Sequence, residues 1–142
     1  MPFTGPDSDR LALRELLDSY ADAVVRNDAD AWGACWAEES RWEMPDYPEF
    51  PPQQGRDSIV GLWVEAMKSF PGVLFHAWPG SIDVNGDRAT MRSYTSEVYD
   101  QGDKTMRDQG VYDDECVKIE GRWYFTKRVF RNIHRQHGPK GV

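Results

Sequence analysis

The chain has 142 residues, a formal net charge of −7 at pH 7, and 39% hydrophobic and 29% charged residues. This length favours one domain with a substantial core, and the acidic balance lacks the electrostatic footprint of a general nucleic-acid binder. No apolar run approaches the roughly 18 residues of a membrane helix, and no signal peptide is visible at the N-terminus. We therefore expect a cytoplasmic protein with no nucleic-acid or membrane partner.

The sequence offers no recognisable cofactor motif. Cys35 and Cys116 lie far apart, and neither C-x-x-C nor H-E-x-x-H occurs, so we expect no metal site. The segment "GRDSIVG" is typical of a helix start rather than of a phosphate-binding loop. Aromatic residues reach 13%. This surplus fits a cavity lined by rings, or a thick core around few helices.

The N-terminal part predicts two helices after a flexible arm at residues 1–7. From about Ser8, apolar residues recur at helical spacing and form one buried stripe. These residues are Leu13, Leu16, Leu17, Tyr20 and Val24. The segment "RNDAD" ends this helix and starts a second one, which Asp28 caps. Trp32, Cys35 and Trp36 give the second helix its buried face.

The next part predicts a short strand, a loop and a third helix. "SRWEM" alternates like a strand, whereas "PDYPEFPPQQG" has four prolines in eleven residues and cannot be a helix or a central strand. It is expected to be a surface loop that carries Tyr47 and Phe50 and could form a lid. The third helix spans residues 56–72, capped by Asp57 or Ser58. Its inner stripe is Ile59, Leu62, Trp63, Ala66, Met67 and Phe70.

From residue 74 onwards the apolar period changes to two. Strands are expected at about 74–84, 88–99, 107–119 and 123–131, with a hairpin at "NGD". Helices followed by antiparallel strands favour a single α+β domain over residues 1–142, with flexible ends at 1–7 and 135–142. A strongly twisted sheet wrapped around helices leaves a cone, whose mouth is a natural small-molecule pocket.

The strand period predicts which polar residues converge in that cone. Residues 91, 93, 95, 97 and 99 share one face of their strand, so Glu97 faces the cone if Tyr99 does. Burial there would raise the pKa of Glu97, which could then act as a base. The alternative for Glu97 is a surface or interface charge. Tyr112 and Asp114 also share a face, and Asp114 could pair with Arg128 or Arg92.

Two further residues have competing interpretations. His76 is the only histidine outside the C-terminal tail, and its ordinary pKa suits acid–base work. The alternative is a core histidine hydrogen-bonded to the backbone. Asp22 lies on nearly the same helix face as Val25. It could serve the site, or it could be a solvated helix carboxylate.

Four segments in this order carry a resemblance to a known family. They are "LRELLDSYADAVVRNDADAWGACWAEESRWEM", "GRDSIVGLW", "FHAWPGSIDVNGDRATMRSY" and "GVYDDECVKIEGRWYFTKR", and they span about residues 11–131. The ordered set resembles the SnoaL-like branch of the nuclear-transport-factor-2-like (NTF2-like) superfamily. The resemblance implies a cone fold with three N-terminal helices packed in a strongly curved antiparallel sheet. This superfamily hosts many chemistries.

The resemblance also implies roles for individual residues. Scytalone dehydratase and hexachlorocyclohexane dehydrochlorinase are cofactor-independent lyases that use a histidine held by an aspartate. His76 falls at the position of that histidine, whereas Val25 falls at the position of the aspartate, for which Asp22 or Glu97 could substitute. The positions of the dehydrochlorinase's pocket lysine, arginine and tryptophan match Tyr20, Arg128 and Trp42.

These features together lead to two hypotheses. The first is a cofactor-independent lyase or isomerase for a small apolar, aromatic or cyclic substrate, in which His76 acts as general acid and base. Catalytic candidates are His76, Tyr20, Arg128, Glu97 and Asp22. Substrate-binding candidates are Trp42, Met44, Val24, Trp63, Tyr99 and Tyr112.

The second hypothesis is a non-catalytic ligand-binding or partner subunit, similar to the small subunits of ring-hydroxylating dioxygenases. The resemblance also implies a homo-oligomer, a dimer or a trimer.

Overall fold

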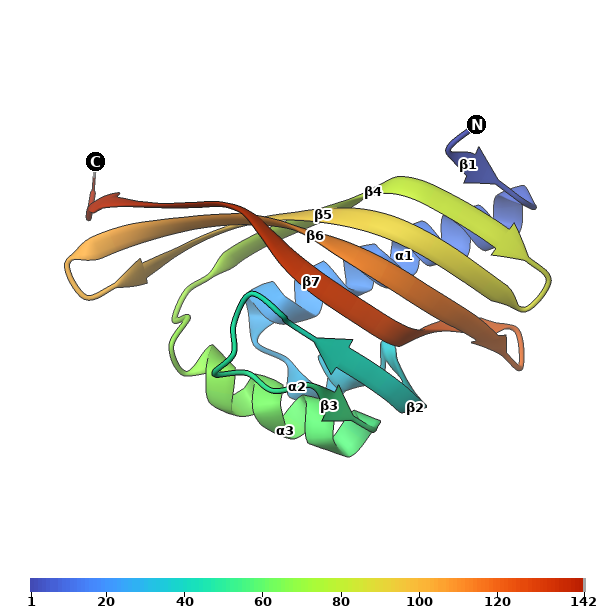
Figure 1. The fold of residues 1–142 in the computed structure, drawn as a ribbon, viewed down its shortest axis with the longest axis horizontal. Coiled ribbons are helices and arrows are strands. Elements are labelled where there is room, and N and C mark those ends of the chain that lie inside the picture. Colours follow the sequence, from blue (N-terminus) through green and yellow to red (C-terminus); the bar gives the residue numbers. More distant parts are fainter. Residues whose placement is uncertain (142) are drawn as a thin grey trace.

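The structure, a computed structural model, describes residues 1–141. Three helices and seven strands follow one another along this part of the chain (Figure 1). Their order is β1 (Phe3–Thr4), α1 (Asp7–Arg26), α2 (Ala29–Gly33), β2 (Trp36–Glu43), β3 (Gln53–Gln54), α3 (Arg56–Met67), β4 (Leu74–Asn85), β5 (Arg88–Gln101), β6 (Lys104–Ile119) and β7 (Arg122–Pro139). None of these helices is both long enough and apolar enough to cross a membrane.

All the strands belong to one curved sheet with the order β1-β4-β5-β6-β7-β2-β3. Strands β4 to β7 are antiparallel neighbours, but β1 runs parallel to β4 and β2 runs parallel to β7. The predicted antiparallel sheet is therefore a mixed one, because β1 and β2 join its long strands from the N-terminal half rather than through hairpins. The predicted α+β cone of the NTF2-like type is confirmed.

Helix α1 lies across one face of the long strands, and α2 and α3 lie beside the β2 edge (Figure 1). The predicted stripe on α1 is buried, and so are the β5 side chains that were predicted to share a face with Tyr99, apart from the half-buried Glu97. Strand β5 keeps an unbroken register with β6 from Arg88 to Gln101, so its alternation is regular. The core therefore fills the concave side of the sheet.

The second helix is shorter than predicted. Asp28 caps it as expected, since its Oδ1 accepts a hydrogen bond from the Ala31 backbone N–H at 3.0 Å. The helix ends at Gly33, and Trp36 is already the first residue of β2, paired with Phe125 of β7. Pairing with β7 overrides the helical spacing of Cys35 and Trp36, although both side chains are buried. The strand predicted at "SRWEM" is confirmed and begins earlier.

Two other predictions differ from the structure. Helix α3 begins at Arg56 as predicted but ends at Met67, and it follows Gly55, whose φ of 91° lies in the left-handed region that favours glycine. Asp57 and Ser58 therefore lie in the first turn and do not cap the helix. The chain ends expected to be flexible are partly strands, because β1 pairs with Ile82 and Asp83 and β7 pairs with β6 as far as Pro139. Val142 lies outside the described residues.

Candidate functional site

A cavity of about 330 Å³ opens between the concave face of the sheet, helices α1 and α3, and the loop that precedes β3. This volume is at the lower end of small-molecule sites. Aromatic rings form a large part of the wall. They are Tyr20, Trp42, Tyr47, Phe50, Trp63, Phe70, Phe75, Tyr99, Tyr112 and Phe130. The cavity therefore suits a ligand with a flat apolar skeleton.

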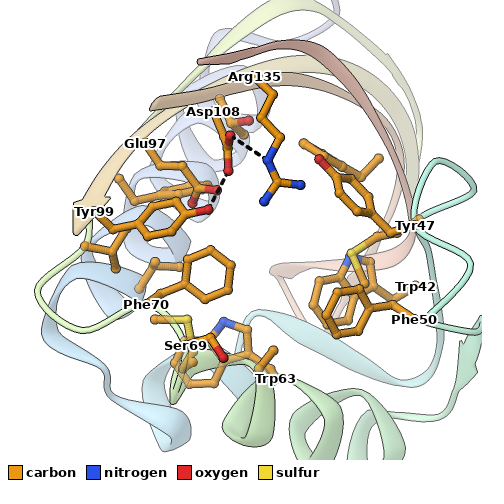
Figure 2. A pocket seen from close by; sticks show the side chains of 18 of the residues that line it. Trp42, Tyr47, Phe50, Trp63, Ser69, Phe70, Glu97, Tyr99, Asp108 and Arg135 are labelled. Atoms are coloured by element: carbon orange, nitrogen blue, oxygen red, sulfur yellow. Dashed lines mark hydrogen bonds and ion pairs between the residues drawn. The ribbon is translucent and has the colours of Figure 1, made fainter. Parts of the chain in front are cut away.

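Polar groups gather on one side of this cavity, where β5, β6 and β7 lie next to one another (Figure 2). We call Glu97, Tyr99, Asp108 and Arg135 the rim cluster. Tyr99 donates a hydrogen bond from its hydroxyl to Asp108 Oδ2 at 2.8 Å, and Arg135 Nε lies 3.5 Å from Asp108 Oδ1. Both cross-strand neighbours of Asp108 belong to the cluster, since Glu97 is its register partner on β5 and Arg135 on β7.

Glu97 is the member of the rim cluster whose pKa this arrangement shifts towards neutral pH. Burial, followed by the negative charge of Asp108, raises the pKa of Glu97 to about 7, and Arg135 opposes this rise. Directly opposed carboxyls repel each other, which favours one proton on the pair. Burial and the neighbouring Asp108 also raise the pKa of Tyr99, so its hydroxyl stays neutral and remains a donor. Glu97 can therefore both accept and release a proton near neutral pH.

A second ionic cluster lies behind the inner wall of the cavity. We call Ser93, Asp114 and Arg128 the buried cluster, since all three side chains are buried. Arg128 Nε donates to Asp114 Oδ1 at 2.7 Å, and the Ser93 hydroxyl donates to Asp114 Oδ2 at 2.8 Å. The Arg128 guanidinium lies 3.7 Å from the centre of the Tyr112 ring. Burial opposes the charge of Arg128, but the Asp114 carboxylate keeps its pKa above the ordinary value.

Tyr112 connects this buried cluster to the cavity wall. Its ring contacts Arg128 from the cavity side, and its hydroxyl accepts a hydrogen bond from Trp42 Nε1 at 3.1 Å. Burial raises the pKa of Tyr112 well above its usual range. Tyr112 and Trp42 therefore form a rigid neutral wall and do not supply a titrating group.

The proline-rich loop closes part of the cavity, as the lid prediction requires. Tyr47 and Phe50 of this loop line the cavity. The loop is tied to β7 by Asn132, whose backbone N–H donates to Asp46 Oδ2 at 2.8 Å and whose side-chain amide donates to the Tyr47 hydroxyl at 3.0 Å. The Tyr47 ring also packs against Phe130, with centroids 6.3 Å apart.

Most of the residues that the sequence proposed for the site do meet at this cavity. Its lining includes Tyr20, Val24, Trp42, Met44, Trp63, Glu97, Tyr99 and Tyr112. Arg128 does not reach the cavity surface, because it is fully buried behind Tyr112 with Asp114 as its partner. Of the two predicted partners of Asp114, Arg128 is the one that the structure shows, and the two form a fully buried ion pair.

His76 lies outside the cavity, so its predicted place in the pocket is wrong. It is exposed on the outer face of β4, next to Trp78, with ring centroids 5.0 Å apart. Alternation traced back from the buried Ile82 would place His76 inside. A register shift between Pro79 and Ser81 reverses the alternation, because one extra residue moves every later side chain to the other face. Ala77 is therefore buried, and His76 faces outward.

The carboxylate sought on the first helix is also absent from the cavity. Asp22 is exposed and binds Arg26 of the same helix, with 2.8 Å between Oδ2 and Nε. Its predicted place in the catalytic site is wrong. Tyr20 and Val24 of the buried stripe occupy the face of α1 that points towards the cavity. Val25 is exposed as well. Neither member of the expected histidine–aspartate pair therefore has a counterpart in this cavity.

The sequence analysis missed two members of the rim cluster, Asp108 and Arg135. Asp108 is the second residue of the strand predicted at 107–119, and Arg135 lies beyond the predicted end of β7 at residue 131. The segments around them are rich in charged and polar residues and show little apolar alternation. The signal that could have found them is the pairing register of the strands. If Glu97 faces the cone, its register partner on β6 must face the same side of the sheet.

Residues 1–141 contain no group of three or more His, Cys, Asp or Glu side chains placed to hold a metal ion. Cys35 and Cys116 are both buried free thiols. The rim cluster is thus the one titratable group of side chains in this cavity to which we assign chemistry.

Several solved structures share this fold at low sequence identity, and they show the fold alone. A candidate scytalone dehydratase from Novosphingobium aromaticivorans is 22% identical with a TM-score of 0.81, covering 95% of each chain. The hexachlorocyclohexane dehydrochlorinase LinA-type3 from Novosphingobium barchaimii is 15% identical with a TM-score of 0.79, covering 95% of this chain and 92% of that one. A candidate aromatic ring hydroxylase from Novosphingobium aromaticivorans is 22% identical with a TM-score of 0.80, covering 95% and 96%.

Sequence comparisons complete the assignment. No curated protein matches the chain significantly. The SnoaL-like domain family matches residues 8–129, which run from the first turn of α1 to the middle of β7. The match covers well over half of the chain, and the protein therefore belongs to the SnoaL-like domain family.

Proposed function

We propose that this protein is a cofactor-independent lyase or isomerase for a small, mostly apolar, cyclic or aromatic substrate, with Glu97 as its general acid and base. The observation that carries the proposal is the half-buried Glu97 carboxyl in an aromatic cavity, opposite Asp108, with a pKa raised to about 7. Catalytic acids and bases work best when their pKa lies near the working pH. The proposal thus moves the proton-transfer role from His76 to Glu97.

The rim cluster divides the work between its two carboxyls. Asp108 accepts the Tyr99 hydrogen bond and faces Arg135, and its negative charge lies beside Glu97. Ionised Glu97 would remove a proton from a carbon next to an electron-withdrawing group and later return it. Elimination, carbon–carbon cleavage and double-bond migration share that first step. The names of two similar structures, a dehydratase and a dehydrochlorinase, are those of enzymes that perform eliminations.

Solvent deuterium incorporation tests this proposal without knowledge of the natural substrate. A panel of cyclic ketones and esters is incubated with the protein in D₂O, and exchange at acidic C–H positions is followed by NMR. We expect Glu97→Gln to slow the catalysed exchange by about 10²- to 10⁴-fold, the usual worth of a general base. Glu39→Gln is the matched control, since Glu39 is exposed on β2. Exchange that survives in Glu97→Gln would contradict the role given to Glu97.

A non-catalytic role is the second candidate. The outward His76 and the exposed Val25 leave the cavity without the pair that the related lyases use, and a similar structure bears the name of an aromatic ring hydroxylase. A partner subunit would show no exchange in isolation and would co-purify with a larger oxidoreductase chain. Exchange by the isolated protein that depends on Glu97 would decide against it.

A further inference from the structure

Arg135 is the one rim-cluster residue with donors to spare. Its Nε is the nitrogen that faces Asp108, at 3.5 Å from Oδ1. Its two terminal nitrogens point into the open part of the cavity (Figure 2), and the guanidinium carbon lies 5.7 Å from the centre of the Tyr47 ring. A planar guanidinium held at one edge presents its other N–H groups in a fixed direction. These donors are therefore preorganised for an acceptor on a ligand.

The charges around Arg135 restrict which kind of ligand atom can accept these hydrogen bonds. Asp108 already balances the guanidinium, and Glu97 and Glu49 also line the cavity. A ligand carboxylate would add one more negative charge to these three carboxyls, which like-charge repulsion disfavours. A neutral oxygen with lone pairs, such as a carbonyl, accepts hydrogen bonds from Arg135 without that cost. The local charge balance thus favours a neutral acceptor.

The walls of the cavity restrict the rest of the ligand. Phe70 and Trp63 lie on one side of the open space, and Tyr47 and Phe50 lie on the other (Figure 2). Aromatic side chains favour stacked or edge-on contacts with another flat ring. The volume of about 330 Å³ is small for a ligand site, so one or two fused rings fill it better than a long chain.

We propose that the cavity takes a neutral cyclic carbonyl compound of about two fused rings, with the carbonyl oxygen bound by the terminal nitrogens of Arg135. This inference rests on the proposed function for its chemistry but not for its test. During the step, the C–H bond next to the carbonyl breaks and an O–H bond forms on Glu97. The electron pair of the C–H bond becomes the new C=C bond, and the carbonyl π pair moves onto the oxygen. Arg135 would then face the developing oxyanion.

Three probes with one skeleton test the proposal by calorimetry: 1-indanone, indane and indane-1-carboxylate. They share a fused bicyclic frame and differ in whether it bears a neutral carbonyl, no oxygen or an anion. We expect 1-indanone to bind at least about tenfold more tightly than the other two. Arg135→Met should abolish this preference while leaving the binding of indane unchanged. Arg131→Met is the matched control, because Arg131 is exposed on the same strand and lies outside the cavity lining.

Each outcome of this titration has a defined meaning. Equal binding of 1-indanone and indane, tighter binding of the carboxylate, or no binding of 1-indanone up to its solubility limit would overturn the proposal. A preference for 1-indanone that persists in Arg135→Met would overturn it as well. Repeating the titration on Glu97→Gln separates the two proposals. If the preference remains there while exchange by the wild-type protein is absent, the proposed function fails and the ligand class stands.

Discussion

The rim cluster and the buried cluster are built on the same plan and differ in what surrounds them. In each, an aspartate of β6 is the register partner of an arginine of β7, and a polar residue of β5 completes the set. The pairs are Asp108 with Arg135 and Asp114 with Arg128. Both carboxylates are buried, but Arg128 is fully enclosed whereas the Arg135 side chain is 46% exposed.

Because of this difference in exposure, the buried cluster supports the fold, whereas the rim cluster is open to a ligand. In the buried cluster both oxygens of Asp114 accept hydrogen bonds, and the guanidinium is enclosed by the rings of Tyr20, Tyr112 and Phe125. Nothing there can meet a ligand. In the rim cluster the Tyr99 hydroxyl donates to the aspartate as Ser93 does in the buried cluster, and β5 adds a second carboxyl, Glu97. The same strand pairing therefore produces a fixed internal support in one place and, in the other, a cluster open to the cavity, to which we assign the proposed proton transfer.

The largest expected difference between the clusters concerns stability. Arg128→Met should lower the free energy of unfolding by about 3–5 kcal/mol, because it leaves the buried Asp114 without its counter-charge. Arg135→Met should lower it by at most about 1 kcal/mol, since a partly exposed pair contributes little. Urea denaturation measures both. The double variant Arg128→Met/Asp114→Leu should recover much of the loss. Equal effects of the two arginine variants would contradict the comparison.

The second expected difference concerns pH and stability. The pKa of Glu97 is about 7 in the folded protein, against 4.5 ordinarily, so the folded state holds a proton that the unfolded state releases. The stabilisation is present below pH 4.5 and is lost as the pH rises through 7. Relative to Glu97→Gln, the wild-type protein should lose about 3 kcal/mol over this window. Urea midpoints at several pH values measure this loss. Parallel curves for the two proteins would show that Glu97 titrates normally.

The same two clusters show how far the sequence analysis reached. The alternation of β5 placed Glu97 and Tyr99 on the cavity side, because that strand runs in register with β6 without interruption. The stripe on α1 placed Tyr20 for a similar reason. Regular periods carry information along the chain, and a position inside such a run can be assigned from its neighbours. The sequence also predicted Arg128 or Arg92 as the partner of Asp114, and the structure shows Arg128.

The sequence predictions failed where the alternation of buried and exposed residues is interrupted, or where a strand has few apolar residues. The register shift at Pro79–Ser81 reversed the faces of β4 and moved His76 outside. A bulge of this kind depends on the pairing with β5 and on local backbone geometry, which residue spacing does not report. Arg135 lies in a polar extension of β7 that only the pairing with β6 defines. The rim cluster is therefore a product of strand register, which local sequence patterns do not encode.

The smallest expected effect tests whether Asp108 tunes Glu97 or only supports the fold. The catalysed exchange should rise with pH and reach half of its maximum near pH 7, because Glu97 must be ionised to act as a base. Asp108→Asn removes the negative charge opposite Glu97 and frees Arg135 from its counter-charge. Both changes favour the ionised form of Glu97, so the midpoint should fall by about one pH unit. The plateau rate should also fall, since a carboxylate with a lower pKa is a weaker base.

A matched control and the direction of the shift make this test decisive. Asp113→Asn removes the same charge from the exposed face of β6 and should leave the midpoint near pH 7. A purely structural Asp108 would lower the rate at every pH without moving the midpoint, because loss of the Tyr99 hydrogen bond alone does not alter the charge that Glu97 faces. A rise in the midpoint would mean that Arg135 no longer reaches Glu97 after it loses Asp108 as its partner. The sign of the shift thus reports which member of the rim cluster controls the proton.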